Sequence, residues 1–288
     1  MRFTAMSQIA ELYGVSTSAV GSDWSQVASR QHCPFLNRRC LKTRKSQPSV
    51  TIGTCTVLHG RESRPVVICP YRLLERQQVF TDTLHLLTLH EPGNELHVVP
   101  EVEIPGGSVD YFLVSARGGK ARDFAGIELQ TLDTTGTVWP ARQHFLQEVK
   151  VRHTKAANPR RGFGMNWKMT AKTTLVQLHH KTATFEHLGK HLVLVTQDCL
   201  TDYVRRAFCF DHVRQARIGD PMHFHTYTLT SNRSRVYSIE LATRASTDSA
   251  GIATCLGLQA EAKVALDDIV KRLEAKMSDE TRLSIHQT

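Results

Sequence analysis

Three apolar segments joined by short polar loops constrain the fold of this 288-residue chain more than any other feature. The segment LHVVPEVEI (96–104) alternates in polarity, and SVDYFLVSA (108–116) follows it after the turn Pro105-Gly106-Gly107. A loop with paired glycines then leads to FAGIELQTLD (124–133). Segments of strand-forming residues separated by such turns are typical of consecutive antiparallel strands. The sequence therefore predicts a three-stranded meander over residues 96–133.

The rest of the chain predicts helices together with two further strands. Apolar residues recur at helical spacing over residues 5–30, 71–90, 171–206 and, most clearly, 258–277. The segments HFHTYTLT (223–230) and SRVYSIELAT (234–243) have the character of strands. A fold that mixes α and β elements follows from these patterns.

Two polar residues interrupt the third segment of the meander on one face. Glu128 and Gln130 are two positions apart, so their side chains point the same way in a strand, and Asp110 lies in the preceding segment. If these strands pair as a hairpin, Asp110 and Glu128 come close together, and their mutual repulsion favours a divalent cation between them. Such a cation can activate water and stabilise charge on a phosphoryl group. The solvated face of an ordinary hairpin is the alternative.

The third position of this set departs from a known nuclease pattern. In the pattern D…(D/E)-x-K, the residue two positions after the second acid is usually a lysine, which helps to position or activate the water. Gln130 stands at that position and carries no charge. Its carbonyl and amide groups can still orient a water molecule.

Four of the seven cysteines fall close together in the first quarter of the chain, at Cys33, Cys40, Cys55 and Cys69. A chain in a reducing compartment does not need disulfides, so a cluster of thiols there indicates a metal, and four thiolates suit zinc or iron. The spacing C-x6-C-x14-C-x13-C is wider than the C-x2-C pairs of common zinc modules. Four small buried hydrophobic residues remain the alternative.

The chain is basic, with 36 Lys and Arg against 27 Asp and Glu and a formal net charge of +9. The excess is concentrated in one stretch, in which Glu148 is the single acid. Its basic residues are Arg142, Lys150, Arg152, Lys155, Arg160, Arg161, Lys168 and Lys172. Lysine and arginine displace counterions from phosphates, so the stretch indicates a nucleic-acid partner. For each residue taken singly, a solvated surface charge is the alternative.

The combined pattern resembles the NotI family of restriction endonucleases from about residue 9 to residue 140. The segments that carry the resemblance, in order, are IAELYG (9–14), CPFL (33–36), Cys40, GTC (53–55), VICPYRLL (67–74), VDYFLV (109–114) and GIELQTLDTTG (126–136). Each part alone is a weak signal, whereas four cysteines followed by a D…E-x-Q set in this order form a specific combination.

The resemblance implies a PD-(D/E)XK nuclease core, an α+β (α/β) fold in which helices flank a central mixed sheet. A helical, four-cysteine metal-binding subdomain would span residues 1–90, and the catalytic and DNA-binding domain residues 91–288. The catalytic set would be Asp110, Glu128, Gln130 and an additional acid at Glu101, for which Glu103 is the competitor. Cys33, Cys40, Cys55 and Cys69 would hold iron, with zinc as the alternative, and Asp110 and Glu128 would hold Mg²⁺.

The implied activity is that of a type II restriction endonuclease, in which a homodimer hydrolyses double-stranded DNA at a GC-rich palindrome with the help of Mg²⁺. A twofold dimer matches a twofold site. A cognate DNA methyltransferase that protects the same site in the bacterial host is the further partner implied. The basic stretch would supply the DNA contacts, from Arg142, Lys150, Arg152, Arg160, Arg161 and Lys168.

Two other functions stay open at this point: a repair or recombination nuclease of the same superfamily that reads DNA structure, and a metal-stapled DNA-binding regulator without catalysis. The chain has no run of about 18 apolar residues, and its first residues lack the long apolar stretch of a signal peptide. We therefore expect no membrane span and a cytoplasmic location in a bacterium. His223 and His225 are expected to be structural or to face DNA.

Overall fold

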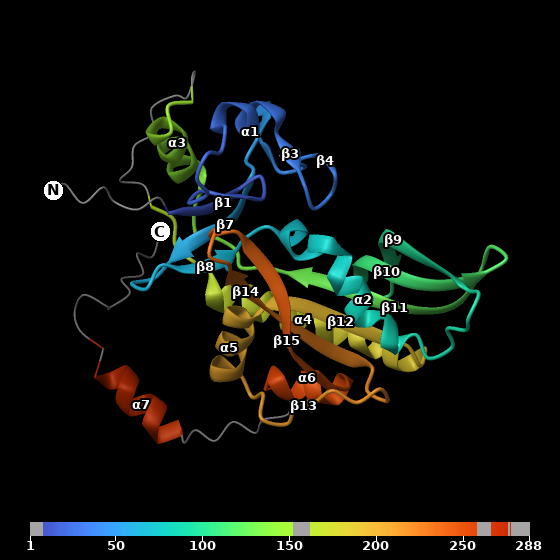
Figure 1. Ribbon diagram of the computed structural model, residues 1–288. Coiled ribbons are helices and arrows are strands. Elements are labelled where there is room, and N and C mark those ends of the chain that lie inside the picture. The colour runs from blue at the N-terminus through green and yellow to red at the C-terminus, as the bar shows by residue number, and fades with distance from the viewer. Residues whose placement is uncertain (1–7, 152–161, 258–265, 276, 278–288) are drawn as a thin grey trace, which may run out of the picture.

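The computed structural model describes residues 8–151, 162–257, 266–275 and 277. Its main feature is a seven-stranded sheet with the order β13-β15-β14-β12-β11-β10-β9 (Figure 1). The strands are β9 (Glu95–Ile104), β10 (Gly107–Arg117), β11 (Lys120–Gln130), β12 (His191–Gln197), β13 (Arg214–Gln215), β14 (Met222–Ser231) and β15 (Tyr237–Thr247).

The predicted meander is confirmed, because β10 pairs antiparallel with β9 on one side and with β11 on the other. Gly106, in the turn between β9 and β10, and Gly107, the first residue of β10, have φ values of +102° and +120°, which glycine adopts far more readily than other residues. The two later strands are confirmed as well, since β14 and β15 form an antiparallel pair.

Residues 171–206 are mainly helical, as predicted, in α4 (Trp167–His187) and α5 (Asp198–Ala207), but the prediction missed the strand β12 between these helices. This strand pairs in parallel with β11 and with β14, so the sheet is mixed. All seven residues of β12 are buried. A strand covered on both faces shows no alternation, and a short apolar run such as HLVLV cannot be told from a buried helix by periodicity.

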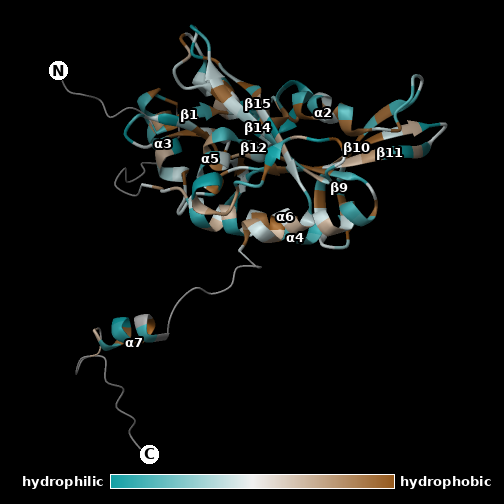
Figure 2. Ribbon diagram, turned by 90° about the horizontal axis from the view of Figure 1, so that it is seen from below, coloured by the Kyte–Doolittle hydropathy of each residue, from teal (hydrophilic) through white to brown (hydrophobic). Residues whose placement is uncertain are grey.

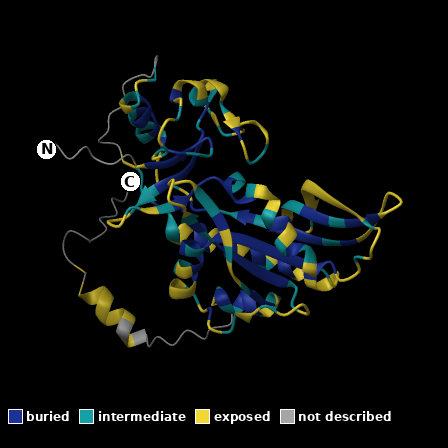
Figure 3. Cartoon of the chain, viewed as in Figure 1, coloured by how far each residue is buried: buried dark blue, intermediate teal, exposed yellow. Residues whose placement is uncertain are grey.

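Helices cover both faces of the main sheet (Figures 1 and 2). One face carries α4 (Trp167–His187), α5 (Asp198–Ala207) and α6 (Ser249–Cys255), and the other carries η1 (Pro70–Gln77), α2 (Gln78–Thr83) and η2 (Leu84–Leu86). Strand residues alternate between the two cores: Leu192 and Leu194 belong to the core under α4, whereas Val193 and Val195 belong to the core under η1 and α2. The central strands are accordingly buried along their length, while β9 at the edge is exposed (Figure 3).

A smaller sheet of order β2-β1-β7-β8 lies at the N-terminal end of the molecule. Its strands are β1 (Ile9–Leu12), β2 (Val15–Ser16), β7 (Thr54–His59) and β8 (Arg64–Val67). Two short hairpins, β3 (His32–Cys33) with β4 (Arg38–Arg39) and β5 (Thr43–Arg44) with β6 (Gln47–Thr51), lie between β2 and β7 in the chain.

The expected helix over residues 5–30 is therefore wrong for the described part of its first half, and only α1 (Trp24–Arg30) is helical. Ile9 and Leu12 are three positions apart, as they would be on one face of a helix. All four residues of β1 are buried, however, so this spacing does not distinguish a strand from a helix. Tyr13 and Gly14, at φ +52° and +73°, then turn the chain back into β2. Residues 71–90 are helical in part, but they form 3-10 and short α segments instead of one continuous helix.

Several contacts tie this N-terminal region to the rest of the molecule. The guanidinium of Arg72, which is buried in η1, pairs with Glu11 of β1 at 2.8 Å and donates to the carbonyl of Tyr237 in β15 at 3.0 Å. From later in the chain, α3 (Trp139–Glu148) packs its Phe145 against Trp24 of α1, with ring centroids 4.8 Å apart.

The last helix, α7, spans Leu266–Glu274 and lies within the amphipathic helix expected over 258–277. Residues 258–265 and 276 of that segment lie outside the described residues. Across the described chain, no helix is both long and apolar enough to cross a membrane.

Candidate active site

Asp110 of β10 and Glu128 of β11 face each other across the hairpin, as the sequence predicted. The neighbouring pair Tyr111 and Ile127 is in register, which places Asp110 and Glu128 at the next opposed position and hence on one face of the sheet. The amide of Leu129 donates a hydrogen bond to Asp110 Oδ2 at 2.8 Å, which fixes the carboxylate of Asp110 against β11.

Both carboxylates are held in a poorly solvated place. Burial raises the pKa of Glu128 to about 7, a hydrogen bond from Lys181 opposes this shift, and the charge of Asp110 adds to it. Burial also raises the pKa of Asp110, against a hydrogen bond from the Leu129 amide and the charge of Lys181. Two acids with raised pKa values on facing strands need a positive group between them, and this is a common property of sites that bind cations or transfer protons.

The two acids open into a cavity of about 150 Å³ between the sheet and α4. Its lining is Asp110, Glu128, Leu129, Gln130, Thr174, Gln177, Leu178, Lys181 and Leu194. Gln130 therefore joins the acids in this cavity, as predicted from its position two residues after Glu128. Its Nε2 donates to the carbonyl of Thr131 at 2.7 Å, which leaves the carbonyl oxygen of the Gln130 side chain as the group that can accept from a water molecule.

Glu101 and Glu103 both lie on the exposed edge strand β9, and their positions relative to Asp110 differ. The pairs Val109–Val102 and Tyr111–Pro100 place Glu101 opposite Asp110, whereas Glu103 pairs with Ser108. The charge of Glu101 contributes to the raised pKa of Asp110. Glu101 also has a left-handed backbone, with φ +52°, which is uncommon for a residue other than glycine. These observations favour Glu101 as the additional acid.

Lys181 of α4 is a residue of this site that sequence reasoning missed. Its Nζ donates to Glu128 Oε1 at 2.6 Å and to the carbonyl of Ser108 at 2.5 Å. The sequence offers no motif for it, because 53 residues separate Lys181 from Glu128. A weak signal was available, since a lysine on the buried side of a predicted helix needs an acidic partner.

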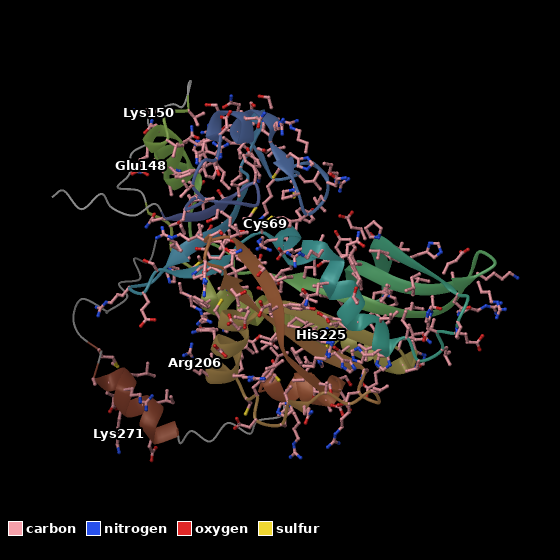
Figure 4. All side chains as sticks on the ribbon, in the orientation of Figure 1. Cys69, Glu148, Lys150, Arg206, His225 and Lys271 are labelled. Carbon is pink, nitrogen blue, oxygen red and sulfur yellow. The ribbon has the colours of Figure 1, made fainter. Side chains whose placement is uncertain are left out.

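The four cysteines of the predicted metal site, Cys33, Cys40, Cys55 and Cys69, are all buried and free. Cys33 lies in β3 and Cys55 in β7. Cys69, labelled in Figure 4, lies between β8 and η1. The four thiols are close enough to influence one another, since Cys40 and Cys33 both contribute to the raised pKa of Cys69, and Cys69 contributes to that of Cys55. In the described chain, however, no three His, Cys, Asp or Glu side chains stand in a metal-binding arrangement.

The structure separates the predicted DNA-contacting residues into three groups. Arg142 is buried, and its guanidinium donates to the carbonyl of Ile52 at 2.7 Å, to Gln143 Oε1 at 2.6 Å and to the hydroxyl of Tyr13 at 3.1 Å. Because these groups occupy its guanidinium inside the protein, Arg142 is not available for the predicted contact with DNA. Lys150, two residues after α3 (Figure 4), and Lys168, in the first turn of α4, are exposed. Arg152, Arg160 and Arg161 lie outside the described residues.

His223 and His225 lie in β14 on the sheet face opposite the cavity, and both are fully buried. One ring nitrogen of His223 lies 2.8 Å from the carbonyl of Asp220. This burial fits the structural role expected for the two histidines and excludes direct contact with DNA in this conformation.

Comparison with known protein families gives a match to the model of the family described as restriction endonuclease NotI, over residues 19–219. This span covers more than half of the chain, and it includes the four cysteines, Asp110, Glu128, Gln130 and Lys181. A search of curated proteins finds no match.

Proposed function

The chain belongs to the NotI family of restriction endonucleases, type II site-specific deoxyribonucleases, and we propose that it cuts DNA at the cavity lined by Asp110, Glu128 and Gln130. The observation that carries this assignment is the facing pair of half-buried acids, Asp110 and Glu128, each with a raised pKa. The mixed sheet with helices on both faces supports a PD-(D/E)XK core. The division into a subdomain of residues 1–90 and a domain of residues 91–288 stays a prediction.

The donor set of the cavity fits Mg²⁺. This ion prefers oxygen ligands and is commonly held by one or two carboxylates with water molecules completing its shell, which is the set that Asp110, Glu128 and the adjacent Glu101 provide. When bound, Mg²⁺ would supply charge neutralisation at the scissile phosphate and a more acidic water molecule. Asp110 and Glu128 would hold the ion, and Glu101 would contribute from the edge strand.

The residues of the chain itself would then orient the reacting groups. The side-chain carbonyl of Gln130 accepts a hydrogen bond from the attacking water, because its amide is already engaged by Thr131. The hydrogen bond from Leu129 holds the Asp110 carboxylate in place through the reaction. The side chains of Leu178 and Leu194, which belong to the core under α4, line the cavity with apolar surface.

The four buried cysteines would form a second, structural metal site. All four thiols are buried, which supports a shared metal ion, although the described side chains do not stand in a metal-binding arrangement. Soft thiolates select iron or zinc over magnesium, and the family resemblance favours iron. Such a site would hold the short hairpins of residues 32–51 in place, since these have few strand pairs of their own.

Recognition of a GC-rich palindrome by a homodimer completes the proposal. Arginine pairing with guanine O6 and N7 is the commonest specific contact to DNA, and arginines are frequent just after the catalytic strands. Exposed Lys150 and Lys168 would contact phosphates and position the duplex. A DNA methyltransferase with the same recognition sequence would protect the host genome.

Digestion of a plasmid library with Mg²⁺, followed by sequencing of the cut ends, tests this proposal. The expected result is cleavage at one GC-rich palindromic sequence, with none in the presence of a chelator. Cleavage that follows DNA branches or ends, independent of sequence, would identify a structure-specific nuclease instead. Tight binding to DNA without any cleavage would identify a regulator.

A further inference from the structure

We propose that Lys181 is the active-site lysine of this enzyme: from α4, its ammonium group helps Gln130 to orient the attacking water and, unlike the uncharged Gln130, stabilises negative charge at the phosphate. This inference rests on the proposed function of the Asp110–Glu128 cavity, and it adds a residue from a different element of the fold. Neither the motif nor the spacing of the acids assigns it.

The position of the Lys181 ammonium is the first observation. Its Nζ lies 2.6 Å from Glu128 Oε1 and 2.5 Å from the carbonyl oxygen of Ser108, the residue two before Asp110. The side chain is only 7% exposed and lines the same cavity as both acids and Gln130. An ammonium has three donors, so these two contacts leave one for a water molecule or a phosphate oxygen in the cavity.

The fold brings Lys181 to this place through close packing of α4 on the sheet. Phe185 of α4 covers Gly126 of β11 so closely that a Cβ at residue 126 would lie 2.4 Å from Phe185 Cζ. One helical turn earlier, Lys181 covers Glu128, two residues further along the same face of β11. A step of two residues along β11 and a step of one turn along α4 therefore bring Glu128 and Lys181 into contact.

The turn between β9 and β10 holds the other side of Lys181. Thr184 Oγ1 donates to the carbonyl of Pro105 at 2.8 Å, and a Cβ at Gly106 would lie 3.0–3.1 Å from backbone atoms of His180 and Lys181. The glycine turn therefore allows the backbone of α4 to approach the hairpin that carries Asp110. Contacts with β11 and with this turn together fix the backbone position of Lys181.

The charge of Lys181 fits the chemistry of phosphodiester hydrolysis. In this reaction the water oxygen forms a bond to phosphorus, and one bond between phosphorus and a sugar oxygen breaks; the water loses one proton and the leaving oxygen gains one. Negative charge grows on the phosphate oxygens as this happens, and a fixed positive group in a water-poor cavity stabilises that charge. Hydrogen bonding from the same ammonium to the water fixes its direction of attack.

A lysine with only a structural role would support the cavity by holding Glu128 in place, and its loss would let the cavity collapse. The two roles differ in what loss of the lysine does to cation binding. Removal of a positive charge that competes for Glu128 leaves cation affinity unchanged or higher, whereas collapse of the cavity lowers it.

The test compares Lys181→Met, Lys181→Arg and the double variant Lys181→Met/Gln130→Lys with the wild type. We expect Lys181→Met to slow single-turnover DNA cleavage about 100-fold or more, while Ca²⁺ titrated alone by calorimetry binds at least as tightly and DNA binding in Ca²⁺ is retained. Lys181→Arg keeps the charge and the pairing with Glu128 but changes the shape of the donor, so it should fold and cut slowly. A lysine returned at residue 130 should recover part of the rate.

Lys190→Met is the matched control, because Lys190 also pairs with a buried acid of β11, Asp123, at 2.5 Å. It should lower the melting temperature without slowing cleavage. Wild-type rates in both Lys181→Met and Lys181→Arg would overturn the inference, as would a rate that falls only in proportion to Ca²⁺ binding. Asp110→Ala separates the two proposals: if Asp110→Ala cuts normally, the site itself is misassigned, and if it is inactive while the Lys181 variants cut, only the lysine is.

Discussion

Phe185 of α4 lies directly over Gly126 of β11, and the contact leaves no room for a side chain at residue 126. A glycine in the middle of a strand weakens the strand, so its presence here needs a reason such as the close approach of another element. The contact sets how closely α4 packs on the sheet, and therefore where Lys181 and the other cavity residues of α4 stand relative to Glu128.

Gly126→Ala should accordingly destabilise the fold by about 1–3 kcal/mol through overpacking and slow cleavage by moving α4 away from the cavity. Chemical denaturation and a single-turnover assay measure the two effects. Gly219→Ala is the control, because a Cβ there would meet no atom of the described chain within 4 Å. Equal stability in the two variants would contradict this role of the Gly126–Phe185 contact.

Asp110→Ala and Glu128→Ala should each abolish cleavage while DNA binding in Ca²⁺ is retained, because only cation ligands are removed. Glu101→Gln should slow cleavage, since Glu101 stands opposite Asp110 and its charge reaches that carboxyl. Glu103→Gln, on the same exposed strand, is the matched variant and should cut at the wild-type rate. The reverse order of these two rates would make Glu103 the additional acid.

Replacement of Cys33, Cys40, Cys55 or Cys69 by serine should remove the bound metal and lower the yield of folded protein. Elemental analysis of the wild type is expected to find about one iron or zinc per chain, retained after Mg²⁺ is removed. Cys199→Ser is the control, because Cys199 is also buried and free but lies in α5, outside the four. A variant with all four cysteines replaced that melts like the wild type would exclude a structural metal.

Arg142→Gln should lower stability by about 1–3 kcal/mol, because it removes a buried charged group together with its three hydrogen bonds. Its effect on DNA affinity per folded molecule should be small. Lys150→Gln should do the opposite: unchanged stability, weaker binding to all DNA sequences, and a smaller dependence of binding on salt. Denaturation curves and binding isotherms at several salt concentrations distinguish the two residues.

The free energy of unfolding should fall as the pH is lowered from about 6.5 toward 4. Burial lowers the pKa of His223 to about 4 and that of His225 to about 3, with help from the charges of His191 and Arg244 respectively. Their ordinary pKa is 6.5, so in this window the unfolded chain binds protons that the folded protein excludes. The contribution of the two neutral histidines to the free energy of unfolding is fully present above pH 6.5. By pH 5, roughly 2 kcal/mol of this free energy is lost for each histidine.

Denaturation at pH 7.5 and at pH 5 measures this loss. The double variant His223→Gln/His225→Gln should show a smaller difference between the two pH values than the wild type. His187→Gln, at an exposed position near the end of α4, should not. If the double variant loses as much stability on acidification as the wild type, other groups account for the acid sensitivity.

The sequence by itself determined the elements whose signals are local. The meander of β9, β10 and β11 follows from alternation and from glycine turns, and the antiparallel register then places Asp110 beside Glu128 with no further information. The order of the four cysteines relative to the D…E-x-Q set was enough to indicate the family that the comparison later matched.

Only the tertiary structure decided which distant residues complete the site. β12 has no alternation because both of its faces are covered, and the role of Lys181 depends on the packing of Phe185 over Gly126, 59 residues apart in the chain. Arg142 looked like a DNA contact until its three partners from distant and neighbouring residues placed it inside the protein. Periodicity and motif spacing report on contacts within one or two elements, whereas burial and charge pairing between elements arise when they pack together.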